Sequence, residues 1–185
     1  MWLCGQGLDG ATVGIVGMGR IGHTVAQCLK PFGVARFVYS DSEKKPEADA
    51  ELGAEFVDLD TLLYQSDFVI ACCALTPQTA GIFNASAFKK MKKTAVFVNS
   101  SRGGIVNQED LIIALESGEI GAAGLDVTVP EPLPTDSPLL KLSNCVVLPH
   151  IGSATFDTRE AMAVLAAQNL IAGLKGEKLP CQVQL

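Results

Sequence analysis

Short runs rich in β-branched residues alternate with segments of helical periodicity along nearly the whole 185-residue chain. The runs predicted as strands are residues 12–16, 36–39, 55–57, 68–71, 95–98, 122–125 and 145–148. Alternating strands and helices form parallel sheets, because the crossover between two parallel strands is long enough to hold a helix. The alternation therefore predicts an α/β fold, with a doubly wound parallel sheet covered by helices.

Helical periodicity fills the gaps between these strands and continues past the last one. After the first strand, Gly33 stands where a helix commonly ends, behind apolar residues at helical spacing: Ile21, Val25, Cys28, Leu29 and Phe32. Further helices are predicted over residues 60–65, 85–91, 108–117 and 158–174. Asn107 is placed to cap the third of these. The last helix carries an apolar stripe that requires a packing partner.

Two polar stretches interrupt the pattern. Residues 41–55 are rich in charge and are predicted to form a solvated loop and helix face. Residues 129–138 contain four prolines, which remove backbone donors and fix the backbone. This segment is predicted to be an ordered surface loop.

The charge balance excludes some classes of partner. A formal charge of −6 and a pI near 4.9 argue against nucleic acids and anionic membranes, which select basic surfaces. No apolar run reaches the roughly 18 residues of a membrane span, and the first residues lack the pattern of a signal peptide. We therefore expect a cytoplasmic protein.

The cysteines and histidines give no metal-ligand pattern. Six cysteines occur without C-x-x-C spacing, and two lie in apolar runs, so we expect reduced core thiols. The two histidines, His23 and His150, have no cluster of carboxylates at ligand spacing. We therefore expect no metal site.

A glycine-rich motif, Gly-Met-Gly-Arg-Ile-Gly at residues 17–22, follows the first predicted strand and opens the first helix. In this context Gly17 permits a tight turn, Gly19 lets the backbone approach a pyrophosphate, and Gly22 lets helix and strand pack closely. The helix N-terminus adds N–H groups that suit an anion. The motif predicts a dinucleotide-binding site.

The end of the second strand decides which dinucleotide binds, because an acidic side chain there bonds the ribose 2′-hydroxyl of NAD. If Ser40 occupies this position, the carboxylate is absent, and Lys44 or Lys45 can attract a 2′-phosphate. If Asp41 occupies it, NAD is favoured. We slightly favour the arrangement with Ser40 at the ribose, which predicts a preference for NADP(H) over NAD(H).

Three polar segments each follow a predicted strand and carry Arg102, Asp126 and His150. The carboxyl ends of parallel strands share one edge, so we expect these residues to converge where the glycine motif lies. Glu131, in the proline-rich loop, is expected to reach the same edge.

This group suits hydride transfer to a 2-oxo acid. The carbonyl oxygen needs a proton, which the imidazolium of His150 can donate while the carboxylate of Glu131 keeps it charged and oriented. The planar guanidinium of Arg102 can bind the substrate carboxylate and polarise the carbonyl.

Taken together, these motifs resemble the D-isomer-specific 2-hydroxyacid dehydrogenases. The matching segments, in family order, are residues 12–22, 75–79, 99–104, 124–127, 130–134 and 148–155. The resemblance implies a Rossmann-type nucleotide-binding domain and reduction of a small 2-oxo acid such as glyoxylate or hydroxypyruvate.

The resemblance also implies roles for individual residues. Arg102 would bind substrate, Glu131 and His150 would form the proton-donating pair, and Asp126 would hold the nicotinamide amide. The cofactor-binding residues would be Gly17, Gly19, Arg20, Ile21, Ser40, Ser42, Lys45, Ala74, Thr79, Ser100, Asp126 and Gly152.

The family also bears on domain organisation. Its members are longer and add a substrate domain that includes the final helix. We therefore expect a dinucleotide-binding domain over residues 1–155, and in residues 156–185 a helix and tail left from a mostly absent second domain. The resemblance implies a homodimer, and the isolated chain is expected to have little or no activity.

Two alternatives stay open. Nuclear corepressors of this superfamily keep the same arginine, glutamate and histidine, so the chain could be a non-enzymatic NAD(H)-binding module. A different dinucleotide enzyme, such as an alanine dehydrogenase or a homocysteine hydrolase, is disfavoured by the order of Arg102, Glu131 and His150.

Overall fold

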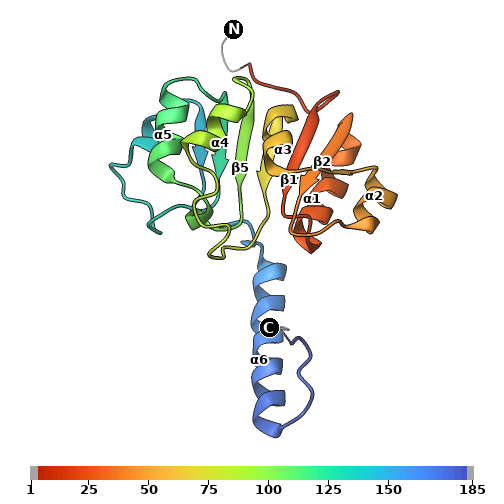
Figure 1. The fold of residues 1–185 in the computed structure, drawn as a ribbon. Coiled ribbons are helices and arrows are strands. Elements are labelled where there is room, and N and C mark those ends of the chain that lie inside the picture. Colours follow the sequence, from red (N-terminus) through yellow and green to blue (C-terminus); the bar gives the residue numbers. More distant parts are fainter. Residues whose placement is uncertain (1–3, 183–185) are drawn as a thin grey trace. The chain divides into compact units, whose positions relative to one another are not determined.

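The computed structural model describes residues 4–182, and within them the strands form a seven-stranded parallel sheet (Figure 1). The strands are β1 (Thr12–Val16), β2 (Arg36–Ser40), β3 (Glu55–Phe56), β4 (Phe68–Ala71), β5 (Val96–Asn99), β6 (Ala122–Leu125) and β7 (Cys145–Val147). Their order is β3-β2-β1-β4-β5-β6-β7, so the winding reverses between β1 and β4. The prediction of a doubly wound α/β fold is confirmed, and such folds bind ligands at this reversal.

Helices cover both faces of the sheet. They are α1 (Arg20–Leu29), α2 (Pro46–Leu52), α3 (Leu59–Gln65), α4 (Ala85–Lys90) and α5 (Gln108–Glu116), with short 3-10 turns η1 (Lys30–Phe32), η2 (Gly103–Ile105) and η3 (Pro138–Lys141). One buried cluster joins the sheet to α3, α4 and α5, and a second joins it to α1 and α2. Alternate strand residues feed the two clusters, as the pleat requires: Val38 enters the first, and Phe37 and Tyr39 enter the second.

The predicted strands agree with the observed ones to within one residue at each end. The predicted capping by Asn107 is also confirmed, because its side chain accepts a hydrogen bond from the backbone N–H of Asp110. Gly33 closes the first helical segment with φ 81°, in the left-handed region that favours glycine.

The predicted apolar face of α1 is wrong in part. Ile21 and Phe32 are 69% and 62% exposed, and the buried residues of α1 are Gly22 and Ala26. Small side chains let the helix backbone lie close to the sheet, so Val25 and Leu29 are only partly buried against the core.

The expectation of reduced core thiols is confirmed only in part, because the six cysteines are reduced thiols but three of them are exposed. Cys28 and Cys181 are exposed, as is Cys4, and Cys72, Cys73 and Cys145 are only half-buried. Cys72 and Cys73 come directly after β4, where the chain leaves the sheet. Adjacent residues of an extended backbone point to opposite faces, and these two thiols accordingly pack against different clusters.

The chain divides into two compact units, one ending at Pro149 and one beginning at His150. The second contains α6 (Phe156–Lys175), which is capped by the Thr155 side chain and ends at Gly176. Many of its large apolar side chains are exposed, from Phe156 at 97% to Leu174 at 81%. Among the described residues, no helix combines the length and apolar character of a membrane span.

Candidate functional site

The loop between β1 and α1 has the geometry that the glycine motif predicts. Gly17 has φ 95°, and a Cβ there would lie 2.5 Å from the backbone nitrogen of Cys73. A Cβ at Gly22 would lie 2.2 Å from the carbonyl oxygen of Gly17. A Cβ at Gly19 would meet no protein atom within 4 Å. Gly17 and Gly22 are thus required by the protein's own packing, whereas Gly19 leaves space beside the loop.

The N-terminus of α1 opens at the same place. Gly19 is its N-cap residue, and no side chain caps the helix there. The first N–H groups of a helix lack intrahelical acceptors and form the positive end of the helix dipole. An uncapped helix start beside an open glycine is suited to bind a phosphate group.

A cavity of about 850 Å³ extends along this loop from the end of β2 to the segment after β4. Of the predicted cofactor-binding residues, those that line it are Gly17, Gly19, Arg20, Ile21, Ser40, Ser42, Ala74 and Thr79. Ligand cavities of drug-sized molecules have this order of volume. Together with the open space at Gly19, the cavity fits a dinucleotide.

The end of β2 brings Asp41 into the cavity wall together with Ser40 and Ser42. Its carboxylate accepts hydrogen bonds from the backbone N–H of Met18 at 2.8 Å and of Ser42 at 2.7 Å. Asp41 is the alternative to Ser40 that the sequence leaves open. Because β2 ends at Ser40, Asp41 is the first residue beyond the strand, where its carboxylate bonds the backbone of Met18 in the glycine loop.

The two nearby lysines are held by other carboxylates. Lys45 Nζ lies 2.6 Å from Glu43 Oε1, and Lys44 Nζ lies 2.8 Å from Asp49 Oδ2. These hydrogen bonds raise the pKa of each lysine. Lys45, predicted as a cofactor-binding residue, does not line the cavity.

Arg102 and Ser100 line an adjoining hollow of about 540 Å³. This hollow and the larger cavity share Ile21 and the segment from Cys72 to Ala74. The buried side chain of Asn99 shapes the turn that carries Arg102, accepting from the N–H of Ser101 and donating to the carbonyl of Arg102. The two adjoining hollows, which together we call the recess, extend from Asp41 past the glycine loop to Arg102.

Glu131 lies in a loop that packs against the turn of Arg102. A Cβ at Gly103 would lie 2.2 Å from the carbonyl oxygen of Thr128, so the two backbones touch there. The backbone N–H of Thr128 donates to Glu131 Oε1 at 3.0 Å. Asp126 follows β6 at the same edge, and its backbone N–H donates to the carbonyl of Asn99. The structure thus brings Arg102, Asp126 and Glu131 to neighbouring segments.

His150 and Gly152 belong to the second compact unit. His150 has φ 57°, a left-handed conformation that non-glycine residues seldom adopt. Residues held in such regions cluster at functional sites, so this backbone conformation favours a functional role for His150.

Sequence reasoning missed the two cysteines that line the recess. Burial raises the pKa of Cys72 to about 11 and also raises that of Cys73. Their thiols therefore remain protonated and are poor nucleophiles. The two cysteines form part of the wall of the recess. The sequence gives no sign of this, because they continue the apolar run of β4 and look like core residues.

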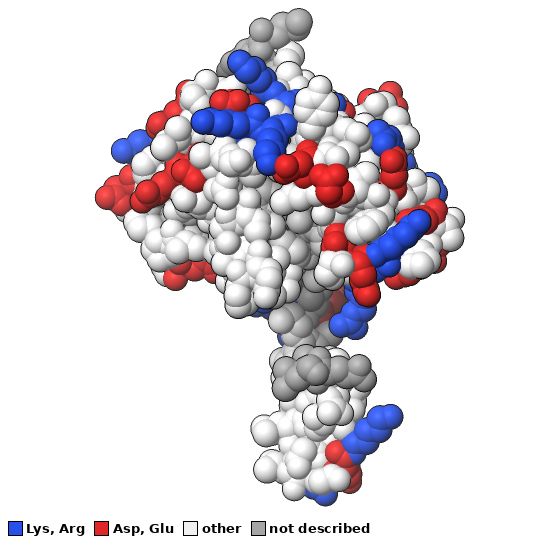
Figure 2. Space-filling view, viewed as in Figure 1, with Lys and Arg blue, Asp and Glu red and all other residues white. Residues whose placement is uncertain are grey.

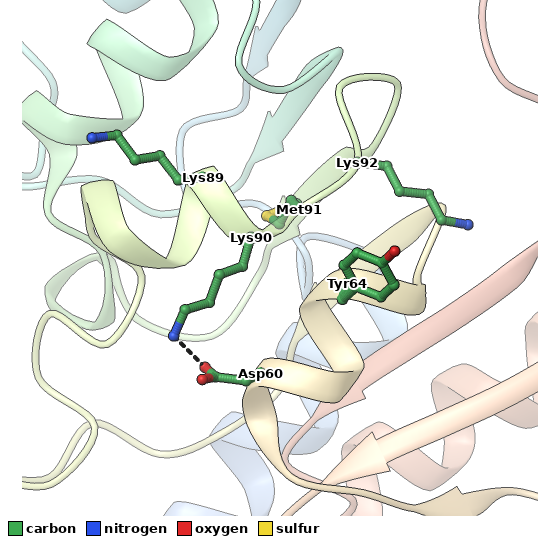
Figure 3. Close-up of a pocket in the computed structure, with 6 residues that line it drawn as sticks. All are labelled: Asp60, Tyr64, Lys89, Lys90, Met91 and Lys92. Atoms are coloured by element: carbon green, nitrogen blue, oxygen red, sulfur yellow. Dashed lines mark hydrogen bonds and ion pairs between the residues drawn. The ribbon is translucent and has the colours of Figure 1, made fainter.

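A separate hollow of about 540 Å³ between α3 and α4 holds none of the predicted site residues (Figure 3). Figure 2 shows basic and acidic side chains mixed along the upper part of this face. Lys90 Nζ lies 2.6 Å from Asp60 Oδ1, and Lys92 Nζ lies 2.8 Å from Asp67 Oδ1. Lys89 and Lys90 also occupy the last turn of α4, where the helix dipole favours cations. Ion pairing and the helix end account for these lysines.

The Asp67 ion pair predicts how stability depends on pH. Burial opposes ionisation of Asp67, but hydrogen bonds from Lys92 Nζ and the N–H of Thr12 outweigh it and lower its pKa. Because the folded pKa lies below the unfolded one, the stabilisation is present at neutral pH and is lost as pH falls through the folded pKa. In urea unfolding, Asp67→Asn should be less stable than the parent at pH 7, and the difference should shrink as the pH falls below the ordinary pKa of an aspartate, about 4. An equal difference at pH 7 and at pH 3 would contradict this.

Within residues 4–182, no group of three or more histidine, cysteine or acidic side chains is placed to hold a metal ion. The charged side chains that line the recess are Arg20, Asp41 and Arg102, among the described residues.

Comparison with known proteins identifies the family. Residues 1–152 match the D-isomer specific 2-hydroxyacid dehydrogenase, NAD binding domain. The chain belongs to this family. Across all of its 185 residues it is 60% identical to glyoxylate reductase/hydroxypyruvate reductase of Homo sapiens and 57% identical to that of Mus musculus. It covers 56% of each of these dehydrogenases, so it spans about half the length of its curated relatives.

Solved structures of the family have the same fold. The TT0316 protein from Thermus thermophilus matches with a TM-score of 0.91 and 44% identity, over 99% of this chain and 57% of that one. A glyoxylate reductase from Paecilomyes thermophila matches with a TM-score of 0.86 and 38% identity, over 95% of this chain and 53% of that one. The Rossmann-like architecture predicted from the sequence is confirmed.

Proposed function

We propose that this dehydrogenase domain serves the reduction of glyoxylate and hydroxypyruvate to glycolate and D-glycerate. The observation that carries the proposal is the recess, in which a dinucleotide-sized cavity adjoins the hollow that Arg102 lines. The 60% identity to glyoxylate reductase/hydroxypyruvate reductase supports this choice of substrates.

The residues at the recess have complementary roles in this reaction. When bound, the reduced nicotinamide supplies a hydride. Arg102 binds the substrate carboxylate through its planar fork and polarises the neighbouring carbonyl. His150 donates the proton to the carbonyl oxygen, and Glu131 keeps the imidazole charged and oriented. Asp126 would hold the carboxamide of the nicotinamide.

The remaining cofactor contacts follow the cavity wall. Gly17, Gly19, Arg20 and Ile21 line the cavity at the start of α1 and would hold the pyrophosphate, and Ser40 and Ser42, at the end of β2, would hold the adenosine ribose. Ala74, Thr79 and Ser100 line the path toward the nicotinamide. Gly152 completes the set beside His150.

For the preferred cofactor we propose NAD(H), a reversal of the slight preference for NADP(H) derived from the sequence. Asp41 supports this choice, because its carboxylate lies in the cavity wall and would repel a 2′-phosphate. Lys44 and Lys45, which the sequence offers as partners for that phosphate, are each paired with a carboxylate.

The chain by itself is proposed to bind the cofactor with little or no turnover. The side chain of Arg102 is exposed, and an active site open to water loses much of its electrostatic stabilisation. The non-enzymatic alternative, an NAD(H)-binding module, predicts the same low turnover. It differs from the reductase proposal because such a module would not bind a 2-oxo acid.

Binding of oxamate, a 2-oxo acid analogue that is not reduced, separates these alternatives. Calorimetry should detect oxamate binding in the presence of NADH, and Arg102→Gln should weaken it at least about tenfold while leaving NADH binding unchanged. Equal oxamate binding by the parent and the variant, or none by either, would contradict the reductase proposal.

We also propose a cytoplasmic homodimer, as the family resemblance implies. The exposed apolar residues Phe32, in η1, and Leu174, on α6, support self-association. Light scattering of the purified chain measures its mass in solution, and cell fractionation tests the compartment.

A further inference from the structure

The side chain of Gln108, at the first residue of α5, binds both backbone groups of a single residue in the Glu131 loop. Its Nε2 donates to the carbonyl oxygen of Val129 at 2.8 Å, and its Oε1 accepts from the N–H of Val129 at 3.0 Å. A glutamine amide carries one donor group and one acceptor, so it can pair with a residue's backbone as a neighbouring strand would.

This clamp acts on a short, well-connected loop. Val129 lies between Thr128, whose N–H donates to Glu131 Oε1, and Pro130, whose carbonyl accepts from Thr128 Oγ1 at 2.9 Å. A displacement of Val129 would therefore carry the Glu131 carboxylate with it.

The other side of the clamp is fixed to the turn of Arg102. The 3-10 turn η2 runs from Arg102 toward α5, and the N–H of Asn107 donates to the carbonyl of Phe83 in the buried core. Gly103 touches the backbone of Thr128. Gln108 thus links the segment that carries the substrate-binding arginine to the loop that carries the proton-transfer carboxylate.

We propose that Gln108 is a positioning residue for Glu131, which it places relative to Arg102 by holding the backbone of Val129. The proposal rests on the proposed function, because only in that reaction does Glu131 take part in proton transfer. Its structural content can be tested independently, because the hydrogen bond from Thr128 to Glu131 reports the place of the carboxylate without turnover.

The test is amide hydrogen exchange, measured by NMR on the full 185-residue chain. Gln108→Met keeps the length of the side chain and removes both bonds to Val129. We expect exchange of the Val129 and Thr128 N–H groups to accelerate about fivefold to tenfold, since a hydrogen bond of this kind contributes about 1 kcal/mol. Glu131→Ala gives the Thr128 rate without the carboxylate.

Two further variants make the result specific. Glu109→Met alters the next, exposed residue of the same helix and should change neither rate. Gln108→Glu keeps the acceptor for the N–H of Val129 but loses the donor, so its exchange rates should lie between those of the parent and of Gln108→Met. It serves as the test variant if Gln108→Met is poorly folded. Unchanged exchange at Ile15 in β1 shows that the sheet remains folded.

Acceleration at Val129 alone would overturn the proposal, because Gln108 would then hold its own partner without placing Glu131. Unchanged rates at both positions would overturn it as well. If the oxamate experiment disproved the reductase function, the exchange result would still stand. The failure of one proposal can therefore be distinguished from the failure of the other.

Discussion

Replacing Gly19 with valine should abolish detectable NADH binding and leave the fold intact. A Cβ at this position would meet no protein atom within 4 Å, and the side chain would enter the space proposed for the pyrophosphate. The φ of −78° and the extended ψ of Gly19 are also favourable for valine. In calorimetric titration we expect the Kd for NADH to rise at least about hundredfold, which corresponds to a loss of about 2.7 kcal/mol.

Two other glycines serve as controls for this substitution. Gly5 is also open within 4 Å but does not line the cavity, so Gly5→Val should change neither binding nor the melting temperature. Gly22→Ala places a Cβ 2.2 Å from the carbonyl of Gly17 and should lower the melting temperature. If Gly19→Val binds NADH as the parent does, the pyrophosphate does not lie at this loop.

Replacing Asp41 with asparagine should shift the chain toward NADPH. Asparagine keeps an oxygen that can accept the hydrogen bond from Met18, so the loop is retained while the charge is removed. The repulsion between a carboxylate and a 2′-phosphate a few ångströms apart is about 1–3 kcal/mol. We expect the ratio of the Kd for NADPH to the Kd for NADH to fall at least about tenfold.

Glu43→Gln is the matched control for the loss of one negative charge in the same loop. Glu43 pairs with Lys45 and does not line the cavity, so its effect on the Kd ratio should be small. Raising the salt concentration should weaken the discrimination of the parent, because ions screen charge repulsion. A parent chain that binds NADPH more tightly than NADH would contradict the role given to Asp41.

The fold was predictable because its determinants are local. β-branched runs of four or five residues and the glycine motif indicate the strands and the first crossover without knowledge of the neighbouring elements. The face of α1 was less predictable, since its buried residues are Gly22 and Ala26, whereas Val25 and Leu29 are only partly buried against the core and Ile21 is exposed. Helical spacing identifies the apolar stripe of a helix, but it does not show how closely the helix approaches the sheet.

The site was predictable only where residues follow strands directly. Arg102 comes a few residues after β5, and its place on the sheet edge follows from topology. The choice between Ser40 and Asp41 depends on the residue at which β2 ends and on a bond to Met18, 23 residues away. Gln108 gives no sequence signal, because its partner lies 21 residues further along the chain.

The most direct test is to map NADH binding onto the assigned amide NMR spectrum of the chain. The recess predicts shifts at Gly19, Arg20 and Ile21 in the loop, at Asp41 beyond β2, and in the segment from Ser100 to Arg102. Saturable shifts at those positions would support binding across the reversal of the sheet. Shifts confined to Tyr64 and Lys89 between α3 and α4, or no saturable shifts at all, would contradict the account.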